Sequence, residues 1–110
     1  MEGYSVEYAQ KDDDSLTTEI HDHLLKREIR RLKAQGYELR ACNLGLGYYP
    51  DAFAVGPYTG GIVFVEVDYL HETPRDKIRA YRKHGKVVVV KTDGRGSRRI
   101  GYGKLANKHV

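Results

Sequence analysis

The run KVVVVK, residues 86 to 91, constrains the fold more than any other part of the sequence. Four consecutive β-branched residues between charged ends leave no polar face, which is typical of a strand covered on both sides of a sheet. Covering both sides requires a further layer on each face. The run therefore predicts an α/β domain whose central sheet has helices on both faces.

The first of these helices is expected over residues 16 to 35, after a polar turn at residues 11 to 15. Ser15 is the predicted N-cap, and Gly36 is the predicted C-terminal stop. On a helical wheel, His21 and Glu28 fall within the apolar half, so two polar groups are expected to point inward. The apolar members of that half are Ile20, Leu24, Leu25, Ile29 and Leu32.

A second, strongly basic helix is predicted from Pro74, with Thr73 as its cap and Gly85 as its stop. The turn residues GPYTGG, 56 to 61, predict a hairpin between the strands on either side of them. Residues 94 to 110 are expected to form an edge strand or a basic tail. The other expected strands occupy residues 3–9, 37–43, 51–55 and 62–68.

Acidic side chains gather where two of these strands meet. In IVFVEVD, Glu66 and Asp68 share one face of the strand, and the predicted hairpin brings Asp51 beside Glu66. Charge at the end of a buried strand costs about 1–3 kcal/mol or more unless it is paired or bound to a cation. Carboxylates in such a cluster suit Mg²⁺ or Mn²⁺, and metal-assisted phosphodiester hydrolysis is the reaction that fits them.

Pro50-Asp51, a hairpin and then Glu66-Val67-Asp68 resemble the motif of PD-(D/E)XK nucleases. The segment QGYELRACNLGLGYYPDAFAV is similar to the approach to that motif in archaeal Holliday-junction resolvases, and the order of elements over residues 16 to 91 resembles the superfamily core. The resemblance implies a restriction-endonuclease-like fold and a metal-dependent endonuclease that cuts DNA. It also implies metal ligation by Asp51, Glu66 and Asp68, with Glu28 completing the site from the first helix.

One position departs from the superfamily pattern, because Asp68 stands where the motif usually has a lysine. That lysine helps to activate water and to offset charge on the phosphate. Lys77, four residues before Tyr81 on the basic helix, is one candidate replacement. Alternatively, Asp68 is a further metal ligand, as the Glu-x-Asp pattern of replication-relaxation-like proteins suggests, and His21 matches the early-helix histidine of those relatives. If neither holds, the chain is a catalytically inactive DNA-binding module.

The net charge of +4 is unevenly distributed, with an acidic start and a basic end. Basic side chains suit a phosphate backbone, although a merely solvated surface explains them equally well. The aromatic residues near the hairpin either stack on bases or pack into the core. The candidate phosphate contacts are Lys77, Arg79, Arg82, Lys83, Arg98 and Arg99.

Simpler roles compete with these functional ones. Asp51 and Glu66 fit a hairpin-end pair held by amides or lysines, and Asp68 fits a solvent-exposed strand end. His21 fits a hydrogen-bonded core histidine, and Glu28 fits an ion pair with Arg31.

Composition sets the remaining expectations. With 110 residues, 40% of them apolar and 31% charged, the chain fits one globular domain over residues 1 to 110. No apolar stretch is long enough to span a bilayer, and the single Cys42 cannot form an internal disulfide, so a cytoplasmic protein is expected. A homodimer would allow two sites to cut both strands of DNA.

Overall fold

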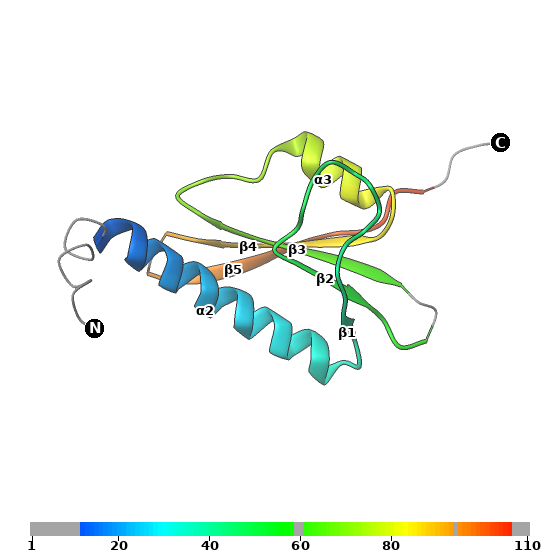
Figure 1. Ribbon diagram of the computed structural model, residues 1–110, viewed down its shortest axis with the longest axis horizontal. Coiled ribbons are helices and arrows are strands. Elements are labelled where there is room, and N and C mark those ends of the chain that lie inside the picture. Colours follow the sequence, from blue (N-terminus) through cyan, green and yellow to red (C-terminus); the bar gives the residue numbers. More distant parts are fainter. Residues whose placement is uncertain (1–11, 59–60, 94, 107–110) are drawn as a thin grey trace.

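The sheet is built around the parallel pair β3 (Ile62–Tyr69) and β4 (Lys86–Thr92). β2 (Ala52–Val55) pairs antiparallel with β3, and β1 (Glu38–Leu39) pairs antiparallel with β2. β5 (Ser97–Tyr102) forms the opposite edge beside β4, which gives the order β1-β2-β3-β4-β5 (Figure 1). The computed structural model describes the chain over residues 12–58, 61–93 and 95–106.

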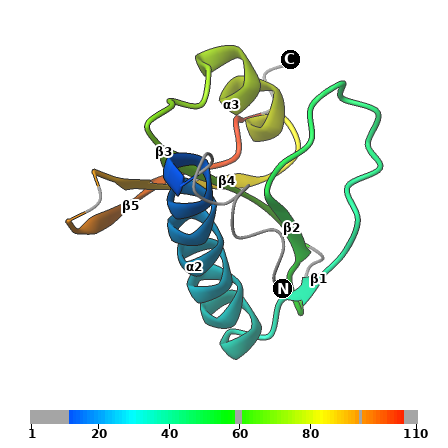
Figure 2. The same cartoon turned by 60° about the vertical axis from the view of Figure 1, so that its left-hand side comes forward.

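Helices cover both faces of this sheet, as the valine run predicts. The long helix α2 (Asp12–Ala34) packs against one face, and the short helix α3 (Arg75–Arg82) lies on the other (Figures 1 and 2). Side chains of β3 alternate between the two layers, so Val65 faces α2 while Phe64 stacks on Tyr81 of α3. The described residues therefore form a mixed α/β structure, and the predicted two-sided sheet is confirmed.

The inward face of α2 has the composition that the helical wheel predicts. Leu24 and Leu32 are buried against the sheet, and Ile20 packs beside them. Glu28 is also buried and His21 is half-buried, so both polar side chains do point inward. The helix begins at Asp12, however, and Ser15 lies inside it, so the predicted turn and N-cap at Ser15 are wrong.

The cap of α3 also differs from the sequence prediction. Pro74, with φ −61°, is the N-cap residue, and no side chain caps the helix by a hydrogen bond. Thr73 instead donates its backbone amide and its hydroxyl to the carboxylate of Asp68. A carboxylate is the stronger acceptor, and it draws Thr73 away from the helix end.

The strand expected over residues 37 to 43 is much shorter than predicted. Arg40 still donates its amide to the carbonyl of Phe53 at 2.9 Å, but the chain then leaves the sheet. Cys42 and Leu46 in the following loop pack against the Phe64 side of the sheet. This loop and α3 therefore cover that face together (Figure 2). The strand predicted at residues 3–9 lies outside the described residues.

The basic C-terminal segment forms the predicted edge strand, since β5 begins at Ser97 and ends at Tyr102. Beyond it, Leu105 donates its amide to the carbonyl of Arg82 at the end of α3. Neither helix of the described ranges has the length and apolar character needed to cross a membrane.

Gly85 offers a test of this packing, because its backbone lies close against Ile62, the first residue of β3. A Cβ atom at this position would lie 2.3 Å from the carbonyl oxygen of Ile62. We expect Gly85→Ala to lower the free energy of unfolding by about 2 kcal/mol or more, measured by urea denaturation. Gly101→Ala is the matched control, since its Cβ would meet nothing within 4 Å and it should leave stability unchanged or slightly raised. Equal stability of the two variants would contradict this packing.

Candidate functional site

A pocket of about 390 Å³ lies beside the carboxyl end of β3, between α2 and the start of α3. Three segments that are distant in the sequence contribute to its lining: α2, the entry to β2, and the stretch from the end of β3 into α3. The pocket brings together five of the residues that the sequence marks as functional. These are His21, Asp51, Glu66, Asp68 and Lys77.

Among the carboxylates that line the pocket, Glu66 is the most deeply buried and is only 5% exposed. Its Oε2 atom accepts a hydrogen bond from the hydroxyl of Tyr81 at 2.8 Å and lies 3.1 Å from Nζ of Lys77. Burial raises the pKa of Glu66, and the charge of Asp51 adds to this effect, whereas Tyr81 and Lys77 oppose it. Burial and the neighbouring carboxylate also raise the pKa of the Tyr81 hydroxyl, which therefore stays a proton donor.

Asp51 is held beside Glu66 by a hydrogen bond to the backbone of β3, the strand that carries Glu66. Its Oδ2 atom accepts the backbone amide of Val67 at 2.8 Å and lies 3.2 Å from Nε2 of His21. The side chain of Asp51 thus extends the antiparallel pairing of β2 and β3 by one position. His21 lines the pocket, and its contact with the acidic cluster is with Asp51 rather than with Glu66. Its Nδ1 atom also lies 3.5 Å from Asp22.

Asp68 lines the same pocket but has structural partners of its own. Besides the two hydrogen bonds from Thr73, its Oδ2 atom lies 3.5 Å from Nζ of Lys91 on the neighbouring strand. The side chain is 8% exposed, so the reading of Asp68 as a solvent-exposed strand end is wrong. Asp68 closes the turn between β3 and α3, in which Leu70 adopts a left-handed conformation with φ 70°.

Glu28 lies on α2 outside the residues that line the pocket. It follows His21 by two helical turns, roughly 10 Å along the axis. Arg99 of β5 donates two hydrogen bonds of 2.8 Å to its carboxylate, and Arg31 lies 3.7 Å from it. The Glu28 side chain raises the pKa of Arg99. The structure therefore gives both Glu28 and Arg99 an ion pair between helix and sheet, at some distance from the other predicted ligands.

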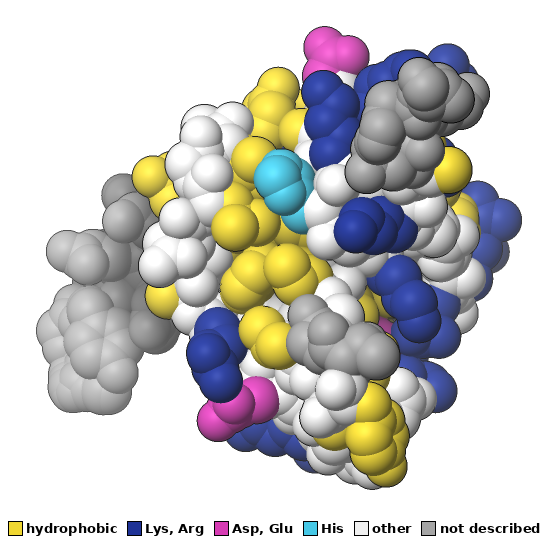
Figure 3. All heavy atoms as spheres, turned by 90° about the vertical axis from the view of Figure 1, so that its right-hand side faces the viewer, with side chains coloured by type: hydrophobic (Ala, Val, Ile, Leu, Met, Phe, Trp, Pro, Cys, Tyr) yellow, Lys and Arg dark blue, Asp and Glu magenta, His cyan; other side chains and the backbone are white. Residues whose placement is uncertain are grey.

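The remaining basic candidates have diverse surroundings. Lys77 faces the pocket, whereas Arg79 on α3 and Lys83, the C-cap residue of that helix, are exposed. Arg82 donates to the carbonyl of Gly103 at 2.8 Å and stands over the ring of Tyr102. Around the end of the molecule where α3 stops and the β2–β3 hairpin turns, Lys and Arg side chains border an apolar area (Figure 3).

The aromatic residues near the hairpin differ in burial. Phe53 is buried against Phe64, and Tyr48 makes an edge contact with Tyr81. Tyr49 and Tyr58 are 78% and 95% exposed, so their rings are accessible for stacking.

No group of three or more His, Cys, Asp or Glu side chains in the described ranges is arranged closely enough to hold a metal ion. Two carboxylates nevertheless offer oxygen atoms for one. No described residue donates a hydrogen bond to Oδ1 of Asp51 or to Oε1 of Glu66. A nearly buried carboxylate with one oxygen unsatisfied calls for a partner, and Mg²⁺ needs only one or two carboxylates when waters and a phosphate complete its shell.

Sequence reasoning missed two residues that organise the site, Thr73 and Lys91. Thr73 was assigned to the helix cap, and the lysine that ends the valine run was treated only as a strand boundary. Their roles depend on the β3–α3 turn and on the parallel register that sets Asp68 opposite Lys91. Neither is encoded in local sequence pattern.

Comparison of the chain with protein-family models, with curated proteins and with solved structures gives no match. The family resemblance of the sequence thus receives no further support from relatives. Any function has to be argued from the chemistry of the pocket itself.

The Glu28–Arg99 pair yields a stability prediction. Arg99→Ala leaves a buried carboxylate with Arg31 alone, so we expect a loss of about 2 kcal/mol in the free energy of unfolding. Arg98→Ala removes the adjacent arginine, which has no hydrogen bond or ion pair within the described chain, and should cost less than about 0.5 kcal/mol. Urea denaturation measures both variants, and equal losses would show that the pair does not support the fold.

Glu66 yields a pH prediction. Its folded pKa is raised above the ordinary value of 4.5, so the folded state binds more protons, and stability falls as pH rises from that value through the raised pKa. Glu66→Gln should remove this fall, because glutamine can still accept the Tyr81 hydrogen bond but does not ionise. Unfolding free energies of both proteins across this range provide the measurement. A parallel dependence in the two proteins would argue against a raised pKa.

Proposed function

We propose that the protein is a metal-dependent nuclease that hydrolyses phosphodiester bonds of DNA in the pocket formed by Asp51, Glu66 and Lys77. The observation that carries the proposal is the 3.1 Å contact between Nζ of Lys77 and Oε2 of Glu66. It supplies a cation next to the carboxylate of the Glu-x-Asp strand, where the sequence lacks the motif lysine. A restriction-endonuclease-like assignment of the fold is part of the same proposal.

The surroundings of each residue suggest its role in the reaction. Asp51 and Glu66 would hold Mg²⁺ or Mn²⁺ through their unsatisfied oxygens, and the metal would lower the pKa of a bound water and polarise the phosphate. Lys77 is in reach of both Glu66 and the open pocket, so its ammonium group can offset negative charge that develops on the phosphate. Tyr81 stays protonated and keeps Glu66 oriented toward that site.

His21 contributes through Asp51. Its Nε2 atom shares Oδ2 of Asp51 with the Val67 amide, so the imidazole restricts the carboxylate to one orientation. Such a contact positions a ligand without touching the metal. Asp68 maintains the β3–α3 turn that carries Lys77 toward the pocket, which gives it a positioning role.

A second candidate, a DNA-binding module without catalytic activity, is favoured by a different observation. Glu66 and Asp68 already have lysine partners in the structure, Lys77 and Lys91 respectively. A carboxylate that is neutralised by the protein has less need of a metal ion. In this case the pocket would be a structural ion-pair network beneath a basic surface.

Cleavage of labelled DNA tests the proposal. We expect the wild type to cut duplex, branched or single-stranded DNA in the presence of Mg²⁺ or Mn²⁺ and to stop when EDTA is added. Asp51→Asn and Glu66→Gln should abolish cutting, and Lys77→Met should slow it at least about 100-fold. These substitutions preserve side-chain size, so folding can be checked by circular dichroism.

Two controls match these variants. Glu38→Gln removes an exposed carboxylate on β1, and Lys33→Met removes an exposed lysine of α2; both should cut DNA at the wild-type rate. An inactive wild type that still binds DNA would favour the module without catalysis. Activity that survives Asp51→Asn and Glu66→Gln would refute the pocket as the site of reaction.

A further inference from the structure

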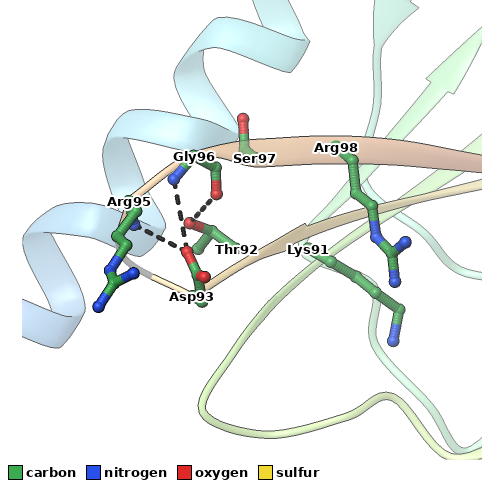
Figure 4. Close-up of a pocket in the computed structure, with 7 residues that line it drawn as sticks. All are labelled: Lys91, Thr92, Asp93, Arg95, Gly96, Ser97 and Arg98. Carbon is green, nitrogen blue, oxygen red and sulfur yellow. Dashed lines mark hydrogen bonds between the residues drawn. The ribbon is translucent and has the colours of Figure 1, made fainter.

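A second pocket, of about 530 Å³, lies at the hairpin that joins β4 to β5 (Figure 4). Among the described residues, its charged lining consists of the cations Lys91, Arg95 and Arg98 and the carboxylate Asp93. Asp93 is turned back toward the hairpin backbone, where Oδ1 accepts the amides of Arg95 and Gly96. These hydrogen bonds lower the pKa of Asp93 and direct the carboxylate to the backbone rather than to the arginine side chains. The pocket is therefore dominated by positive charge.

Two of the cations are placed directly opposite each other. Lys91 and Arg98 are cross-strand partners in the β4–β5 register, and their side chains point to the same side of the hairpin, away from α2 (Figure 4). Like charges in such positions repel and destabilise a sheet. An arrangement of this kind requires compensation by negative charge.

Among the described residues, carboxylates compensate only the charge of Lys91. Nζ of Lys91 lies 3.5 Å from Asp68 and 3.2 Å from Glu72. The guanidinium groups of Arg98 and Arg95, in contrast, have no hydrogen bond or ion pair to the parts of the chain that the structure describes. With respect to the described residues, two arginine side chains thus remain available for an anion from outside.

This cationic pocket continues from the candidate active site. Asp68 is paired with Lys91 in the parallel register of β3 and β4, and Lys91 is paired with Arg98. The three side chains form one row across adjacent strands, so Arg98 lies two strand spacings, roughly 10 Å, from Asp68. A polyanion whose cleaved phosphate occupied the active-site pocket would pass over this row.

We propose that the β4–β5 hairpin pocket binds the phosphodiester backbone of nucleic acid next to the phosphate that is cleaved, with Arg95 and Arg98 as its ligands. The inference rests on the proposed function, because it uses the position of the active site to identify the anion. Arginine suits this task, since its planar guanidinium donates two hydrogen bonds to one phosphate. Contacts of this kind fix the path of the strand and carry no sequence preference.

DNA binding without metal separates this site from catalysis. We would measure fluorescence anisotropy of a labelled duplex in EDTA over a series of salt concentrations, for the wild type and the double variant Arg95→Ala/Arg98→Ala. Loss of two phosphate contacts should weaken binding about 10-fold or more at low salt and reduce the slope of log K against log salt by about 1.8. The expected loss is the same for different sequences.

The control removes equal charge from another surface. Arg30→Ala/Lys33→Ala takes two exposed cations from α2 and should preserve both the affinity and the salt slope. Equal effects of the two double variants, or a wild type that does not bind DNA, would overturn the hairpin site. Inorganic phosphate serves as a competitor in the same binding measurement. If it displaces the duplex at a concentration comparable to that of the DNA phosphate groups, the hairpin site is overturned, because a single anion then binds the pocket as well as a phosphodiester backbone does.

Cleavage in Mg²⁺ distinguishes failure of this inference from failure of the proposed function. If the wild type does not cut DNA but the hairpin variant loses salt-sensitive binding, the hairpin site stands and the nuclease proposal falls. If Asp51→Asn abolishes cutting while the hairpin variant binds and cuts like the wild type, the nuclease proposal stands and the hairpin site is refuted.

Discussion

The parallel pairing of β3 with β4 is the interaction on which the rest of the structure depends. It places the two most apolar segments of the chain side by side, and their alternating side chains form the cores beneath both helices. The same register sets the carboxylate of Asp68 opposite the ammonium of Lys91. Because side chains on a strand alternate, a shift of one residue would reverse the faces and place the acidic side chains of β3 under α2.

Polar residues of β3 are tolerated in this core because each has a specific partner. Glu66 extends the face that begins with Phe64, and the ring of Tyr81 stacks on Phe64 while its hydroxyl reaches Glu66. Tyr81 thus completes the apolar layer and also donates a hydrogen bond to the carboxylate of Glu66. Burial that would otherwise be costly is compensated by packing and hydrogen bonding from the same residue.

The sequence predicted the features that depend on periodicity. The valine run, the alternation in IVFVEVD and the turn residues before it led to a central strand, a hairpin and the convergence of Asp51 and Glu66, whereas Lys77 was one of two candidates suggested by the family resemblance. It could not predict contacts that depend on where distant segments meet. Glu28 was expected near the carboxylates because it points inward, but its position along α2 places it beside Arg99 of β5. Likewise, Thr73 matches a helix cap locally, and only the fold brings Asp68 within its reach.

The contacts of Glu66 also determine when its surroundings form during folding. Lys77 and Tyr81 follow Glu66 by only 11 and 15 residues and lie in the connection between two paired strands, so these three side chains meet within one short β-α-β unit. Asp51 is as near in the sequence, because it lies at the start of the β2–β3 hairpin, whereas His21 comes from α2, before the long loop between β1 and β2. Contacts between nearby residues form with little loss of chain entropy, whereas distant ones require closure of longer loops. Asp51, Glu66, Lys77 and Tyr81 therefore belong to consecutive elements that can meet early, whereas the contact of His21 with Asp51 forms only when α2 packs on the sheet.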